Sequence, residues 1–597
     1  MRASLHRVLF LILVSLSLGL TARHALAAEK IFLFPAGYIA AKDLPEDFRG
    51  RVRSIRFDRK DAFEGTVARS RLERWVYNLG NDIHVISRET TLRRRMLFAE
   101  GGEISKDLLA ETERTLRAEE FLSDAMIAVG PVENGQCEIL VMTYDQWTTV
   151  AAAGAKAEGL KGSDVFYGRW DRIWENDLYW FLGLFETNLA GTGTMVGGAI
   201  RHDPIRNGSE LTFRNQNLTP LMLQVSAKAA WLSDGDSVEM RVNRPLLSRT
   251  DKYAYGLTYT SREISERLYF DANQLGDLPD SVAENQAGEP GLLRVYDRVA
   301  TRELSASFLR SFGMDLKFNI GPAFTYRDRR NQGGLGEADT ALLPFVPVPA
   351  SALEPYERSD ALLGVSLGLY RYGFRTSRNF RNLKWSESVE TGWRLNTKAS
   401  VNQAWLGADN SHFHLHQEAL YSGFWSDLAY ASAGAAWQSF LSPSGDPSFG
   451  QVDAWWEGSL RPHRKTASWA TASWTHLYAT PRSVQLPLGE LNGLTGFPSF
   501  YFAGQARFLA TAEQRYFPDF EWLTMVPAFA AFVNAGNTFP TYREFVPGDL
   551  HYSLGLGLRL GRSKSTQKSV QHINLTFPLA DDFLTGPVFS ILAKKTL

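Results

Sequence analysis

From about residue 150 onward, large apolar residues recur at every second position of the chain. In Tyr552–Leu560, each large apolar residue alternates with Ser, Gly or Arg. The same alternation is found in Tyr253–Tyr259, Met314–Ile320, Leu363–Leu369 and Trp393–Lys398. Because successive side chains of a β-strand point to opposite faces, this period of two predicts strands with one apolar and one polar face.

A soluble β-sandwich and a membrane barrel differ in whether the apolar faces of their strands point inward or outward. A sandwich turns its apolar face inward. Here the predicted strands approach the length of about ten residues that crosses a bilayer at a tilt, and aromatic residues recur near their ends. At roughly 27 residues per strand and loop, residues 151–597 predict an antiparallel transmembrane β-barrel of about sixteen strands, and the fold class is mainly β.

Residues 28–150 show a different pattern, which predicts a small α+β domain. Helical spacing of apolar residues alternates there with short period-two segments. Ser105 is a candidate helix N-cap, and Asn134–Gly135 is a candidate turn between two strands. In chain order the predicted elements are the strand Arg51–Asp58, the helices Val67–Leu79, Thr90–Phe98 and Ser105–Glu120, and the strands Asp124–Val129 and Cys137–Tyr144.

The first 27 residues have the three-part pattern of a secretory signal peptide. Arg2, His6 and Arg7 form a basic start, and an apolar run from Val8 to Leu20 follows. Small residues end the segment at Ala27, where we expect cleavage. The apolar run is too short to span a bilayer as a helix, which argues against a membrane anchor.

Composition excludes several classes of function. The net charge of −1 gives no bulk attraction for nucleic acid, and the single cysteine, Cys137, cannot form an internal disulfide. The chain contains no Gly-x-Ser-x-Gly elbow, phosphate loop or dinucleotide fingerprint. We therefore expect no catalytic residues, no cofactor and no enzyme activity.

Several segments of the N-terminal part resemble a polypeptide-transport-associated (POTRA) domain. They are Arg94–Gly102, Glu113–Arg117, Phe121–Leu122 and Asp145–Thr149, the last of which resembles the junction into the barrel. The resemblance implies a periplasmic domain that binds an extended polypeptide along a sheet edge. The alternative is a spacer that only caps the barrel.

Segments of the barrel part resemble the BamA/TamA family of outer-membrane barrels. They are Glu186–Gly193, Asn243–Leu246, Leu494–Phe497, Glu513–Phe517 and Phe532–Asn537. The resemblance implies a loop near residues 486–505 that folds into the lumen, with a motif formed by Leu494, Thr495, Gly496 and Phe497. It also implies loop-anchoring strands that carry Glu513, Arg515, Asn534 and Gly536.

Two positions depart from the family pattern. The family has Arg where Thr495 stands and Asp where Asn534 stands, and these two residues meet in the lumen. Replacing only one member of a charged pair in a confined lumen is costly, because the remaining charge is then buried without a partner. Here both positions are neutral, so we expect Thr495 and Asn534 to face each other through a weaker hydrogen bond. The alternative is a loop placed independently of Asn534.

His412, His414 and His416 form a polar row with Glu418 on one face of a predicted strand. Alternating histidines can chelate a metal. Any lumen-facing strand also shows such a polar row, so we interpret these residues as lumen lining and expect no metal.

The function that the resemblance implies is assistance in the insertion or translocation of polypeptides at the bacterial outer membrane, with the N-terminal domain in the periplasm. Its partners would be outer-membrane lipid, unfolded or extended polypeptide clients, and periplasmic proteins or lipoproteins, but no nucleic acid. The alternative is an outer-membrane channel or structural barrel gated by its lumen loop.

Overall fold

A computed structural model describes most of the chain. The described residues are 34–63, 70–157, 178–202, 206–269, 292–331, 357–378, 380, 386–463, 465–480, 484–518, 520–522, 524–565, 569–579 and 587–595. The predicted signal peptide, residues 1–27, lies outside them.

Short elements come first along the chain, and long strands follow. The N-terminal elements are β1 (Ile39–Ala40), η1 (Ala41–Asp43), β2 (Arg49–Lys60), α2 (Arg71–Ile83), α3 (Glu89–Arg93), β3 (Glu103–Ser105), α4 (Lys106–Arg117), β4 (Leu122–Val129) and β5 (Gln136–Asp145). The next strands and turn are β6 (Thr149–Ala157), β7 (Leu178–Glu186), η2 (Leu189–Gly191), β8 (Thr194–His202), β9 (Asn207–Asn215), β10 (Gln224–Leu232), β11 (Gly235–Arg244), β12 (Tyr253–Tyr269), β13 (Leu292–Phe312), β14 (Lys317–Asn331), β15 (Arg358–Arg378) and β16 (Ser386–Asn402). The last are η5 (Ala404–Leu406), β17 (His412–Phe424), β18 (Ala429–Leu441), β19 (Pro447–His463), β20 (Thr466–Tyr478), β21 (Leu486–Leu488), η6 (Glu490–Asn492), β22 (Phe502–Gly504), β23 (Ala506–Tyr516), β24 (Met525–Phe539), η7 (Tyr542–Glu544), η8 (Pro547–Asp549), β25 (His551–Arg562), β26 (Ser569–Leu579) and β27 (Val588–Lys595).

The elements β1 to β5 form one sheet in the order β1-β4-β5-β2-β3, with α3 and α4 packed against it. We call this unit the N-terminal module. The Ser105 side chain accepts a hydrogen bond from the Leu108 N–H, which confirms the predicted N-cap of α4. Leu109 and Leu116 on α4 are fully buried in the core, together with Ile139 from β5. The core is therefore formed between the apolar face of α4 and the sheet.

The remaining long strands form a closed antiparallel barrel, whose order runs from β6 to β20 and then from β23 to β27, which returns to β6. In the described part of the chain this sheet has 20 strands, so the predicted number of about sixteen is wrong. The early strands are short and follow each other closely: β10 and β11 have 9 and 10 residues and are separated only by Ser233 and Asp234. The assumed repeat length of 27 residues was too long for this region.

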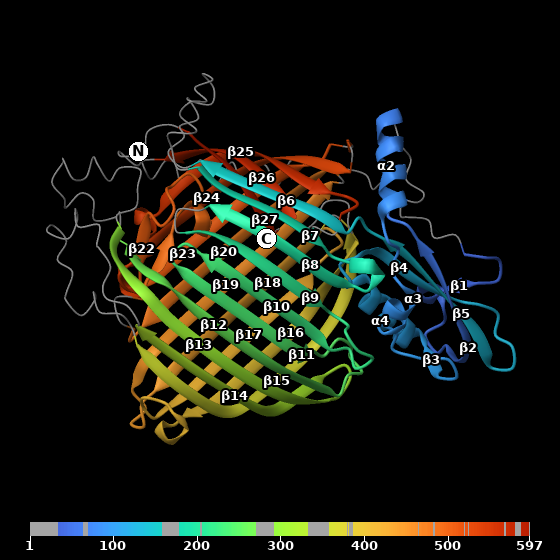
Figure 1. Ribbon diagram of the computed structural model, residues 1–597, viewed down its shortest axis with the longest axis horizontal. Helices are drawn as coiled ribbons and strands as arrows, with labels where there is room; N and C mark the ends of the chain where they lie inside the picture. Colours follow the sequence, from blue (N-terminus) through green and yellow to red (C-terminus); the bar gives the residue numbers. More distant parts are fainter. Residues whose placement is uncertain are drawn as a thin grey trace.

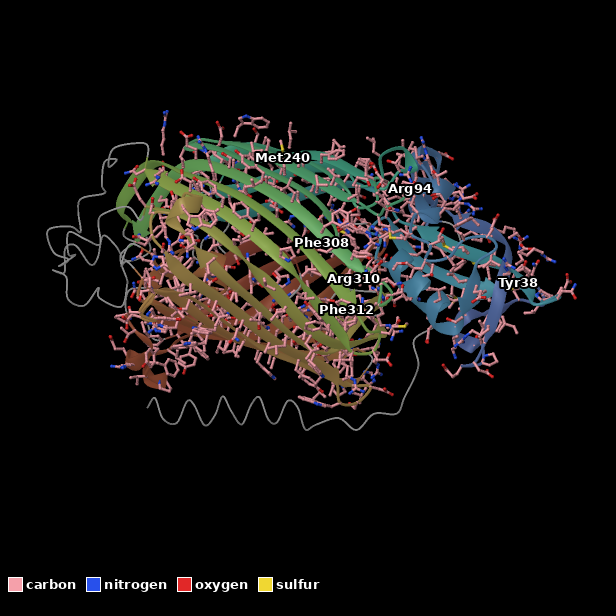
Figure 2. The ribbon with its side chains drawn as sticks, turned by 90° about the horizontal axis from the view of Figure 1, so that it is seen from below. Tyr38, Arg94, Met240, Phe308, Arg310 and Phe312 are labelled. Carbon is pink, nitrogen blue, oxygen red and sulfur yellow. The ribbon has the colours of Figure 1, made fainter. Side chains whose placement is uncertain are left out.

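The outer face of the barrel is apolar and the inner face is polar. On β25, Leu554 and Leu556 are 38% and 62% exposed, whereas Ser553 and Arg559 on the opposite face are buried. Figure 2 shows Met240 and Phe308 on the wall of the barrel, and both side chains are largely exposed. An outward apolar surface of this kind is typical of barrels in lipid. No helix in the described ranges is long and apolar enough to cross a bilayer.

The N-terminal module lies at one end of the barrel, and β22 lies at the opposite end (Figure 1). The barrel thus has a module end, where the turns between strands meet the module, and a far end, where β21 and β22 pair with each other.

Candidate functional site

Residues 485–505, which we call the lumen loop, form a compact hairpin between β20 and β23. Its two short strands, β21 and β22, pair through Leu486 to Leu488 and Phe502 to Gly504. The Glu490 carboxylate accepts a hydrogen bond of 2.7 Å from the Gly496 N–H. The Asn492 side-chain amide donates to the Pro487 carbonyl oxygen at 2.9 Å. These internal bonds hold the tip of the loop in one shape.

Thr495 at the tip of the loop contacts Asn534 on β24. The Asn534 amide nitrogen donates to the Thr495 hydroxyl oxygen at 2.6 Å, and both side chains are buried. Asn534 also donates to Ser553 on β25 at 3.1 Å and accepts from Thr511 on β23 at 3.0 Å. The expected contact between the two neutral residues is present, so the loop is not placed independently of Asn534.

Gly496 lets the loop tip approach the barrel wall. Its φ of +92° lies in the left-handed region that favours glycine. A Cβ atom at this position would lie 2.8 Å from Thr576 Cγ2 on β26 and 3.5 Å from Ser553 Cβ on β25. The neighbouring Leu494 and Phe497 are buried as well, and Phe497 packs against Phe502, with ring centroids 5.5 Å apart. The tip of the loop, which carries the predicted motif, therefore lies close against β24, β25 and β26.

The other side of the loop reaches the distant strand β12. Gln485 accepts a hydrogen bond from the Tyr269 N–H at 3.0 Å and donates one to the Tyr269 carbonyl oxygen at 2.9 Å. The rings of Phe500 and Tyr269 are stacked, with centroids 4.8 Å apart. Since β12 is separated from β23 by eight intervening strands in one direction and ten in the other, the loop joins opposite walls of the barrel.

Glu513 and Arg515 lie on β23 but belong to a separate buried charge cluster. The Glu513 carboxylate binds Arg515 on the same strand and Arg559 on β25, with an N–O distance of 2.6 Å to Arg559. Arg559 also donates to Asn574 on β26 at 2.7 Å. Other residues of β23 contact the lumen loop: Arg507 donates to the Pro487 carbonyl oxygen at 3.2 Å, and Leu509 lies against Gly493.

Gly536 supports the loop in a different way. A Cβ atom at Gly536 would lie 3.2 Å from Leu488 Cδ2 in the loop, so a side chain at this position of β24 would press on β21.

Sequence reasoning missed Gln485 and Arg507, because the residue types carry no signal of which distant strand they meet.

We expect Asn534→Ala to loosen the loop tip. The change removes the hydrogen bonds to Thr495, Ser553 and Thr511. A net loss of about 2 kcal/mol in the free energy of local opening corresponds to roughly thirtyfold faster amide hydrogen exchange at Gly496. Asn534→Asp is the control, because its oxygens can accept from the three hydroxyl groups. Equal exchange rates in Asn534→Ala and the parent protein would contradict this role.

At the module end, the barrel turns dock onto the N-terminal module. The Arg88 N–H donates to the Gly191 carbonyl oxygen at 2.8 Å, and Arg95 donates to the Gln216 carbonyl oxygen at 2.9 Å. Gly191 has a φ of +73°, and a Cβ atom there would lie 2.6 Å from the Ile86 carbonyl oxygen. Figure 2 shows Arg94 at this junction. The segment Glu186–Gly193 is thus a docking turn.

Asp145 lies in a buried polar cluster at the same junction. Its carboxylate accepts hydrogen bonds of 2.7 Å from both the N–H and the hydroxyl group of Ser87. His84 Nε2 lies 3.9 Å from this carboxylate, and Asn188 from the barrel donates to the Ser87 hydroxyl oxygen at 2.9 Å. Burial raises the pKa of Asp145 from 3.8 to about 6, although the bonds from Ser87 oppose the rise.

This raised pKa predicts a pH dependence of module stability. Folded Asp145 holds its proton more tightly than unfolded Asp145, so its contribution is fully present below about pH 4 and is lost as the pH rises through about 6. Between these two pH limits, the contribution of Asp145 to the free energy of unfolding changes by about 3 kcal/mol. We expect Asp145→Asn to flatten the profile of module unfolding between pH 4 and 6, measured by hydrogen exchange in the full-length protein. An unchanged slope in the variant would assign the dependence to other groups.

The histidine row lies on β17. His414 is buried and packs against Phe440, with ring centroids 4.5 Å apart, while the neighbouring Phe413 is 53% exposed on the opposite face. Among the residues that the structure describes, no group of three or more His, Cys, Asp or Glu side chains is arranged to hold a metal ion.

The fold and the site define a class: a closed antiparallel β-barrel with an α+β module at one end and a lumen loop fixed to its inner wall. No protein-family model matches the chain, and no curated protein matches it.

Solved structures to which the chain is similar include BamA from Haemophilus ducreyi lacking POTRA domains 1–3, with 14% sequence identity and a TM-score of 0.35 over 91% of this chain and 83% of that chain. CdiB from Escherichia coli has 11% identity and a TM-score of 0.42, over 91% and 75% of the two chains. CdiB from Acinetobacter baumannii has 11% identity and a TM-score of 0.41, over 91% and 73%. Likenesses of this size assign neither a family nor a function.

Proposed function

We propose that this protein is an outer-membrane barrel that assists the insertion or translocation of polypeptides without catalysing a reaction. The observation that carries the proposal is the position of the loop anchor. Thr495 and Gly496 contact β24, β25 and β26, which lead directly to the closing pair β27–β6. A change in the loop can therefore reach the strands next to the closing pair.

The N-terminal module is tied to the same side of the barrel. The Trp147 N–H, two residues before β6, donates to the Lys564 carbonyl oxygen between β25 and β26 at 2.8 Å. In our proposal the closing pair opens locally and its strands pair with an incoming strand. Backbone pairing at a sheet edge supplies the driving force, so no nucleotide or cofactor is needed.

Strand β4, which is covered at the edge of the sheet only by the two-residue strand β1, supports a second step, in which the POTRA-like module holds an extended client. The chain's own β1 already pairs there, through Ile39 with Val129 and Ala40 with Ala128. This pairing supports the idea that the edge accepts an added strand. Periplasmic proteins or lipoproteins would approach the module from the side that faces away from the barrel.

The test is to deplete the protein and to measure the abundance of all outer-membrane proteins. We expect the loss of particular barrels or surface proteins, and restoration by the wild-type gene. Partial restoration by Asn534→Ala would connect the loop anchor with the activity. An unchanged outer-membrane proteome after depletion sinks the proposal.

A gated channel is the second candidate, because the lumen loop joins opposite walls of the barrel through Asn534 and Tyr269. A segment placed in this way obstructs the path of solutes. Conductance in planar bilayers, combined with no effect of depletion on other outer-membrane proteins, would favour the channel.

A further inference from the structure

Helix α2 exposes its apolar face. Leu72, Trp75, Leu79 and Ile83 are 53%, 61%, 42% and 61% exposed. Their spacing of three and four residues places them in one stripe along the helix. The sequence pattern predicted a helix in this region but not that its apolar stripe points away from the module. We call these four residues the α2 stripe.

The opposite side of α2 is occupied by the module, so the stripe cannot turn inward. The ring of Tyr77 stacks on Phe63, with centroids 5.0 Å apart. A Cβ atom at Gly80 would lie 2.5 Å from the Phe63 ring, so this glycine permits the close packing. The Asn81 side chain accepts a hydrogen bond of 3.1 Å from the Phe63 N–H. These contacts fix the rotation of the helix about its axis.

The same contacts fix α2 relative to the barrel. Phe63 lies against Trp147, with ring centroids 6.1 Å apart, and the Trp147 backbone binds Lys564 between β25 and β26. Figure 1 shows α2 at the module end, running across the direction of the barrel axis. A helix in this position lies parallel to the surface of a bilayer around the barrel.

A cluster of aromatic residues on the outer wall of the barrel indicates where the surface of the bilayer would lie. At the module end of β12 and β13, Tyr253, Phe308 and Phe312 are exposed. Arg310 lies over the rings of Tyr253 and Phe312, at 4.3 and 5.4 Å from their centroids. Figure 2 shows Phe308, Arg310 and Phe312 at this end of the wall, beside the module. Aromatic rings with long basic side chains are typical of the membrane interface.

The charges on α2 suit a phospholipid surface. Arg71 and Arg74 are exposed beside the α2 stripe and the intervening Glu73 is buried, while Asp82 is exposed at the C-terminal end of the helix. A helix with one apolar face, flanking basic residues and an exposed Trp is typical of segments that lie in the headgroup region.

We propose that α2 is an interfacial membrane helix that inserts the α2 stripe into the lipid leaflet on the module side of the barrel. The inference rests on the membrane location proposed above. Helix α2 would hold the module against the bilayer beside β25 and β26, in addition to the contacts made by the docking turns. Arg71 and Arg74 would bind anionic headgroups.

The test uses the full-length protein in nanodiscs of phosphatidylethanolamine and phosphatidylglycerol. A nitroxide label is attached to Leu79→Cys in the stripe, to Asn78→Cys on the polar side of the same helix, or to Met240→Cys on the outer wall. The parent protein is the labelling blank, because its Cys137 is buried. We expect the label at position 79 to be more accessible to oxygen and severalfold less accessible to a water-soluble nickel complex than the label at position 78.

The label at position 240 separates the two proposals. If it contacts lipid while the label at position 79 is in water, the interfacial helix is refuted and the membrane barrel stands. If position 240 is in water, the membrane location itself fails. Shielding of position 79 from both reagents means that protein covers the stripe. If the label at position 79 becomes shielded from the two reagents only after an unfolded polypeptide is added, the stripe binds a client polypeptide. Both results overturn the lipid contact.

A second variant tests the same contact without a label in the stripe's centre. Trp75→Glu should move a label at Ile83→Cys from lipid toward water, because a carboxylate opposes insertion of the stripe. Asn78→Glu is the matched control and should leave the label in lipid. An equal effect of the two variants contradicts the proposal.

Discussion

Glu513→Gln should destabilise the barrel by about 3 to 5 kcal/mol, because it leaves two buried guanidinium groups without their carboxylate. Arg515 and Arg559 both bind Glu513, and all three side chains are almost fully buried. The remaining bond from Arg559 to Asn574 does not neutralise its charge. We expect the temperature at which the folded barrel converts to the unfolded form on a detergent gel to fall markedly.

A matched control is available on the same inner wall. Glu303 and Arg327 pair across β13 and β14 with an N–O distance of 2.8 Å, but their side chains are 30% and 46% exposed. Breaking a solvated pair costs about 1 kcal/mol or less, so Glu303→Gln should have a small effect. The double variant Glu513→Gln/Arg559→Gln should recover part of the loss. Similar shifts for Glu513→Gln and Glu303→Gln would show that burial does not set the cost.

The combined change Gln485→Ala/Phe500→Ala should open the lumen. It removes both hydrogen bonds and the stacked ring that hold the loop to Tyr269 on the opposite wall. Barrels of 16 strands or more leave an aqueous lumen unless a segment fills it. We therefore expect conductance in planar bilayers to rise several-fold above that of the parent protein.

Gln438→Ala is the control for this measurement. Its amide pairs with Gln451 across β18 and β19 and is not part of the lumen loop. We expect it to leave the conductance unchanged. If the loop variant conducts no better than this control, the contact with Tyr269 is not the barrier to solutes.

Much of the fold follows from local patterns. The period of two places Leu554 and Leu556 on one face of β25, and the residue types at Ser105 and Asp107 mark the start of α4. These signals lie within a few residues of each other along the chain. The strand number failed because turn length is not encoded in strand alternation, and short turns such as the one after β10 were missed.

The site was only partly predictable for a related reason. Thr495 and Asn534 could be paired because a resemblance placed them together. Glu513 and Arg559 could not, because their contact depends on the register of β23, β24 and β25. The α2 stripe shows the same limit: helical spacing predicts a helix, but it does not say whether Leu79 faces the core or the surroundings.

The pairing of β6 with β27 also constrains how the barrel forms. Arg562 on β25 donates to the carbonyl oxygen of Ala151 on β6 at 3.4 Å, across a separation of 411 residues. Contacts between such distant parts of a chain form late, because a very long loop must close first. Until β27 has been synthesised and paired, two strand edges stay open to other chains and to proteases. The rate at which β27 pairs with β6 therefore controls how long these edges stay exposed.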